Sequence, residues 1–122
     1  MTFRVEPVHD ITHTCPSGHN IPDHPLDLDH DTWTCRTCRQ SVLIKMGTAQ
    51  GQHFSVERVS ALDVREGDYL VCRVNGGHQR LKVHRLGRQA EVCELFVEQH
   101  GRLPWGATRY LNCIRADSHP LH

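Results

Sequence analysis

The 122-residue chain lacks a long apolar run, which argues against a membrane-spanning helix. No stretch reaches the ~18 consecutive apolar residues that such a helix needs, and the mean hydropathy is −0.51. The N-terminus, MTFRVEPVHD, has no basic segment followed by an apolar one, so the pattern of a secretory signal is missing. We therefore expect a cytoplasmic protein of a single small domain, or a small domain with an appendage, and no membrane partner.

The chain also lacks a net charge. Fourteen Lys and Arg residues balance fourteen Asp and Glu residues, so no overall attraction to nucleic acid or to a membrane surface is implied. Only a local patch could provide one.

The first third of the chain, to about Ser41, has few periodic apolar residues and many Pro, Asp, His and Thr residues. Such a segment cannot bury enough apolar surface to fold alone, so something else must order it. Six Cys and eleven His residues without an export signal favour reduced thiols and metal binding over disulfides.

Two short motifs in this segment have the spacing of metal ligands. Cys15 and His19 lie in CPSGH, and Cys35 and Cys38 lie in CRTC, with fifteen residues between the two pairs. Structural zinc sites take four tetrahedral nitrogen and sulfur ligands, usually as two pairs that each come from a tight turn. We predict a Zn²⁺ site with no open position for water, although another histidine could replace His19. The alternative ligands are His13, His24 and His30.

The same two motifs resemble the zinc-binding core of the actinobacterial RNA polymerase-binding protein RbpA. The resemblance covers roughly residues 12–41, in HTCPSGHNI and DTWTCRTCRQS. It implies a zinc-ribbon-like module that binds RNA polymerase or its sigma factor as a transcription regulator, in an actinobacterium or a phage. The basic linker and the C-terminal charged helices of that family have no counterpart here. The matched residues are Cys15, Gly18, His19, Trp33, Cys35 and Cys38.

From Gln52 onward the sequence is typical of short strands with period-two alternation. NGG at 75–77 predicts a hairpin turn. Residues 88–100 fit a strand or a helix, and the strand is favoured. We expect a mostly β protein, with a zinc-ribbon-like module at 1–45 and a small SH3-like or OB-like β-barrel at 46–122. The predicted strands are residues 53–59, 68–74, 80–86, 91–98 and 109–114.

Several cations alternate with apolar residues and could form a phosphate-binding face, although a solvated sheet face explains them better. Three further cysteines in apolar runs are interpreted as buried, reduced residues. Trp105 is an exposed anchor for a protein partner or, more simply, packs over one end of the barrel. The cations are Arg73, Arg80, Lys82, Arg85 and Arg88, and the cysteines are Cys72, Cys93 and Cys113.

No Ser or Cys is spaced with a His and a third group as a catalytic set would be, so we expect a protein that is not an enzyme. The expected function is binding of a macromolecular partner, with RNA polymerase as the leading candidate. The alternatives are a nucleic-acid-binding module and a zinc-stabilised structural subunit of a larger, possibly phage, assembly.

Overall fold

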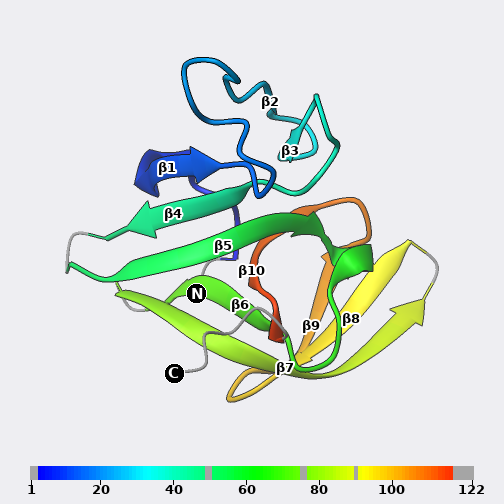
Figure 1. Cartoon of the computed structure of the whole chain (residues 1–122). Helices are drawn as coiled ribbons and strands as arrows, with labels where there is room; N and C mark the ends of the chain where they lie inside the picture. Colours follow the sequence, from blue (N-terminus) through cyan, green and yellow to red (C-terminus); the bar gives the residue numbers. More distant parts are fainter. Residues whose placement is uncertain (1–2, 49–50, 75–76, 90, 117–122) are drawn as a thin grey trace.

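The computed structural model describes residues 3–48, 51–74, 77–89 and 91–116. Eight strands form one antiparallel sheet in the order β1-β4-β5-β10-β6-β7-β8-β9, and β2 and β3 form a small second sheet (Figure 1). The elements are β1 (Asp10–Thr14), β2 (Leu28–Asp29), β3 (Thr34–Cys35), β4 (Leu43–Gly47), β5 (His53–Ser60), β6 (Tyr69–Val74), β7 (Gly77–Gln89), β8 (Val92–Val97), β9 (Gly101–Gly106), β10 (Tyr110–Ile114) and two 3-10 turns, η1 (Pro7–His9) and η2 (Ala61–Asp63).

All five predicted strands are present, as β5, β6, β7, β8 and β10. The segment 88–100 contains strand β8, so the strand interpretation is confirmed over a helix. Two residues of the predicted hairpin turn, Asn75 and Gly76, lie outside the described residues, but Val74 and Gly77 on either side of them are paired. Strands β1, β2, β3, β4 and β9 were not predicted.

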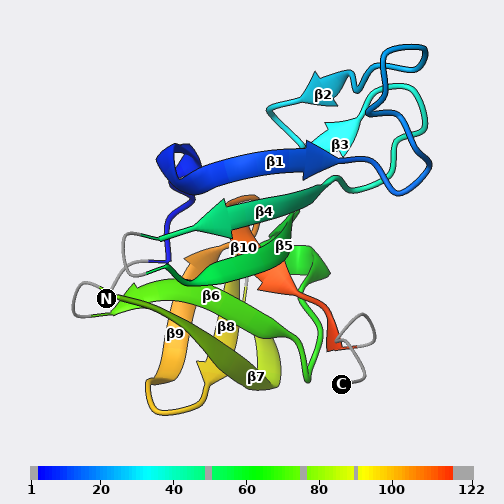
Figure 2. The same cartoon turned by 60° about the vertical axis from the view of Figure 1, so that its left-hand side comes forward.

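The sheet is open, not closed as the expected barrel would be. Strand β7 is thirteen residues long and pairs with β6 along its first half and with β8 along its second. The register shifts between Val83 and Arg85, where the strand changes partners. The sheet curls at this strand, but β1 and β9 lie at opposite ends of the strand order (Figure 2). The likeness to SH3-like or OB-like folds stays a prediction.

The curled sheet is buried on both faces at strand β6. In β6, Leu70 and Cys72 pack into one apolar cluster, whereas Val71 between them packs into the other. Alternate side chains of a strand point to opposite faces, so this continuous apolar run marks a strand that is covered on both sides. The first cluster contains Cys72, Cys93 and Cys113, which are buried and free, as expected.

A buried ionic network joins the N-terminal part of the chain to the sheet. The Arg58 side chain is 0% exposed, and its two terminal nitrogens donate to the two carboxylate oxygens of Asp10 at 2.7 and 2.6 Å. Arg58 Nε donates to the Asn112 side-chain oxygen at 2.8 Å, and the guanidinium lies 4.3 Å from the ring centre of Trp33. Strands β1, β5 and β10 and the turn before β3 therefore meet at one side chain.

The boundary predicted between residues 45 and 46 stays a prediction, and β4 extends across it. This strand pairs with β1 on one side and with β5 on the other. Both flanks of the cysteine-rich segment are thus part of the main sheet, with β2 and β3 projecting beyond it (Figures 1 and 2). No helix among the described residues is long and apolar enough to cross a membrane.

Replacing Arg58 tests how much the buried network contributes to the stability of the fold. Arg58→Met leaves the Asp10 carboxylate buried without its partner, so we expect the free energy of unfolding to fall by about 3–5 kcal/mol. Arg102→Gln is the matched control, because the Arg102 side chain is 54% exposed in its ion pair with Glu94, and an exposed pair contributes little to stability. Urea unfolding measures both, and equal losses would contradict the prediction.

Candidate metal centre

The first pair of predicted ligands is positioned by a tight turn after β1. The Gly18 backbone N–H donates to the Cys15 carbonyl oxygen at 2.9 Å. Gly18 has a φ of +88°, in the left-handed region that glycine adopts without a Cβ penalty. This turn brings His19 back beside Cys15.

The second pair comes from a turn that begins in β3. Cys35 is the last residue of that strand and is paired with Leu28 of β2. The Arg39 N–H donates to the Cys35 carbonyl oxygen at 2.6 Å, and Arg39 has a left-handed φ of 63°. The chain reverses within these few residues, so Cys38 returns to the same side as Cys35.

The four side chains converge. His19 Nδ1 lies 3.4 Å from Cys15 Sγ and 3.6 Å from Cys35 Sγ, and the sulfurs of Cys15 and Cys38 are 3.4 Å apart. All four ligand atoms lie within 4.8 Å of one another. A tetrahedral ion with Zn–S bonds of about 2.3 Å and a Zn–N bond of about 2.0 Å requires ligand atoms spaced by about 3.5–3.8 Å. The arrangement therefore fits a four-coordinate metal ion of this size.

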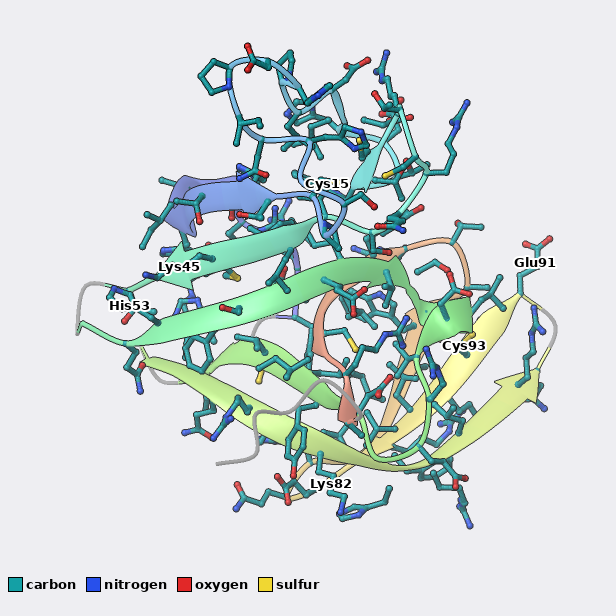
Figure 3. The ribbon with its side chains drawn as sticks, viewed as in Figure 1. Cys15, Lys45, His53, Lys82, Glu91 and Cys93 are labelled. Atoms are coloured by element: carbon teal, nitrogen blue, oxygen red, sulfur yellow. The ribbon has the colours of Figure 1, made fainter. Side chains whose placement is uncertain are left out.

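The cluster lies where the projecting segment meets the sheet. Cys15 and Cys35 are almost fully buried, at 1% and 0% exposed, whereas His19 and Cys38 are half-buried. Figure 3 labels Cys15 at this junction, beyond the end of β1. No disulfide joins the four residues, because all three cysteines are free.

The environment of Cys15 favours the thiolate that a metal needs. Burial opposes the charged form, but hydrogen bonds from the His19 ring and the Ser17 backbone N–H outweigh it and lower the pKa of the Cys15 thiol to about 6. Outside the cluster burial has no such compensation: it raises the pKa of Cys72 to about 11 and that of Cys113 to about 12. Cys15 is thus electrostatically distinct from Cys72 and Cys113.

The second pair is asymmetric. Burial opposes the thiolate of Cys35, but the backbone N–H groups of Cys38 and Thr37 point at its sulfur and lower its pKa. At Cys38 the Gln40 N–H favours the thiolate, whereas burial and the neighbouring sulfurs outweigh it and raise the pKa. Crowded sulfurs repel one another when charged, and a bound cation removes this cost.

The alternative histidines are outside the cluster. His13 contacts the Asp10 carboxylate at 3.2 Å and stacks parallel to Trp33, while His30 meets the edge of Trp33 with ring centres 5.6 Å apart. His24 has its ring centre 6.4 Å from that of His19. Within the part of the chain that the structure describes, Cys15, His19, Cys35 and Cys38 are the one group with metal-binding geometry.

Trp33 connects the cluster to the sheet, whereas the sequence predicted only that it braces the turn that carries Cys35 and Cys38. Its backbone has a left-handed φ of 57°, its N–H donates to the Asp29 carbonyl at 2.7 Å, and its carbonyl accepts from Val42 N–H at 3.1 Å. The ring is 9% exposed and lies over Arg58. The role of Arg58 was missed, because one Arg in an alternating strand reads as solvent-facing.

The predicted basic face is divided between surfaces. Arg80, Lys82 and Arg88 are all exposed on β7, but they lie on different faces of the strand. Arg80 pairs with Val71 of one apolar cluster, whereas Arg88 pairs with Cys93 of the other. Arg73 forms an ion pair with Glu6 at 3.5 Å. Arg85 lies over the ring of Phe96, 4.1 Å from its centre.

Comparison with known proteins found no relative of this chain. No family model matches the chain, no curated protein matches it, and no solved structure matches it. Inference about the site rests on its own geometry and chemistry.

Metal analysis tests the site directly. Purified protein should contain one metal ion per chain, with zinc expected for three thiolates and one imidazole. Cys35→Ser should lose the metal, whereas Cys93→Ser, a buried cysteine outside the cluster, should keep it. Elemental analysis gives the content, and retention of the β signal in circular dichroism excludes global unfolding. Metal-free wild-type protein would contradict the assignment.

The lowered pKa of Cys15 predicts a pH dependence in the metal-free protein. A thiol whose pKa falls on folding stabilises the fold above its unfolded value, near 9, and loses that contribution as pH falls through about 6. Thiolate absorbance in the ultraviolet should therefore show a titration near pH 6 that disappears in Cys15→Ser. Titration of every cysteine near or above pH 9 would refute it.

Proposed function

We propose that Cys15, His19, Cys35 and Cys38 bind one zinc ion and that the ion has a structural role. The observation that carries the proposal is the convergence of four donor atoms within 4.8 Å in a segment with little apolar core of its own. Three cysteines and one histidine fill a tetrahedral coordination sphere, so no position remains for a catalytic water. The ion would instead provide ordering energy for a zinc-ribbon-like module at residues 12–41.

The chain then acts as a binding module and not as an enzyme. The module and the sheet are joined through Trp33 and the buried Arg58, so they present a common surface to a partner. The spacing of the ligand pairs and the position of Trp33 support RNA polymerase or its sigma factor as that partner, through the resemblance to RbpA.

Nucleic acid is the weaker alternative. Arg80 and Lys82 share one face of β7, the exposed Arg88 lies on the other, and acidic side chains are interleaved with the cations. Glu98 accepts a hydrogen bond from the backbone N–H of Lys82, and Glu94 is paired with Arg102. Nucleic acid that bound such a surface would release fewer counterions than on a continuous basic stripe, so its affinity would be lower.

Binding to purified RNA polymerase tests the proposed partner. Wild-type protein and Cys93→Ser should co-elute with actinobacterial core enzyme or sigma-bound holoenzyme, and Cys35→Ser should not, because its module is unfolded. Size-exclusion chromatography at low and moderate salt measures the complex. If zinc-loaded protein binds neither form at low salt, the polymerase hypothesis fails, whatever the metal content.

A further inference from the structure

Both tryptophans of the chain line one surface groove. Trp33 comes from the metal-binding segment, and Trp105 and Tyr110 come from β9 and β10. Arg4, Val5 and Pro7 of the N-terminal segment and Arg109 complete its walls, and the cavity has a volume of about 390 Å³. Segments from three distant parts of the sequence therefore meet at this groove.

The groove is cationic on a chain of zero net charge. Arg4 and Arg109 are exposed, and neither forms an ion pair among the described residues. No acidic side chain is among the described residues that line the groove. Arg109 lies 4.6 Å from the ring centre of Trp105, an arrangement that leaves the N–H edge of a guanidinium available to a carboxylate.

The chemistry of these walls is that of a protein interface. Trp, Tyr and Arg are the residues most enriched where binding energy is concentrated, and here they occur together. Trp105 Nε1 is buried and has no hydrogen-bond partner among the described residues.

The rings are poorly arranged for stacking nucleic-acid bases. One face of Trp33 is covered by the buried Arg58 and one face of Trp105 by Arg109, while the edge of the Phe3 ring contacts Trp105 with centres 6.2 Å apart. Single strands are bound mainly through open aromatic faces along a basic path. Two cations beside covered rings favour carboxylates carried on a polypeptide.

We propose that this groove docks an extended, acidic segment of a partner protein. The proposal deepens the function proposed above and rests on it only in treating the chain as a binding module. Carboxylates pair with Arg4 and Arg109, and apolar side chains of the segment pack on the edges of Trp33, Trp105 and Tyr110. Because Trp33 lies between the two halves of the metal cluster, docking requires that segment to be ordered.

Intrinsic tryptophan fluorescence reports on this groove, since the chain has two tryptophans and both line it. The probes are extended synthetic peptides in which Asp and Glu alternate with Pro, Leu or Phe, and the same peptides with Asn and Gln instead. We expect the acidic peptides to change the fluorescence and bind in calorimetry, and their amide counterparts to bind at least about tenfold more weakly.

The variants separate the groove from general charge. Arg109→Gln and Arg4→Gln should each weaken acidic-peptide binding about tenfold, with metal content unchanged. Arg85→Gln is the matched control, because Arg85 also lies over an aromatic ring but on another surface, and it should bind as wild type. Equal losses in all three variants would overturn the proposal.

Three further outcomes overturn it. They are failure of every acidic peptide to bind, equal binding of the amide peptides, and tighter binding of oligothymidylate at the same salt concentration. These results are independent of the polymerase test. If the acidic peptides bind but polymerase does not, the groove proposal stands and RNA polymerase is rejected as the partner. If polymerase binds and Arg109→Gln does not weaken that binding, polymerase contacts another surface of the protein.

Discussion

The buried guanidinium of Arg58 is the constraint around which the two parts of the chain are arranged. A charge removed from water must be paired and hydrogen-bonded, and Arg58 meets this requirement with Asp10, Asn112 and the ring of Trp33. Each partner belongs to a different segment. If β1, β10 or the turn before β3 moved away, a buried charge would lose part of its compensation, so this one side chain fixes their relative positions.

This constraint explains why the metal-binding segment need not have a core of its own. One side of Trp33 contacts Arg58 of the sheet, and the same residue precedes the strand that carries Cys35. Apolar packing continues across this junction, since Cys15, Trp33 and Cys35 share a cluster with residues of β4 and β5. A metal ion would order the outer side of the segment, and the ionic network already holds the inner side.

The features of the structure that depend on local sequence patterns could be predicted from the sequence. Ligand pairs within one turn and alternating strands such as β8 have signals within a few residues, so their positions could be read directly. What it could not predict depends on contacts between distant residues. Strand β1 carries polar DITHT and is a strand because β4 pairs with it, and β9 contains Pro104 and two glycines that argue against a strand. Arg58 resembles a surface residue until Asp10, 48 positions away, is placed beside it.

The proposed docking groove also depends on contacts between distant parts of the chain. Its walls come from the N-terminal segment, from the metal-binding segment and from β9 and β10, and no single one of these forms a binding surface. A partner that recognises the assembled walls binds only the state in which Trp33 is ordered beside the sheet. If both proposals hold, thermodynamic linkage works in both directions: the metal raises affinity for the partner, and the partner raises affinity for the metal by the same factor. Under the two proposals, a structural ion would control binding without contacting the ligand, because it would set the population of the surface that the ligand recognises.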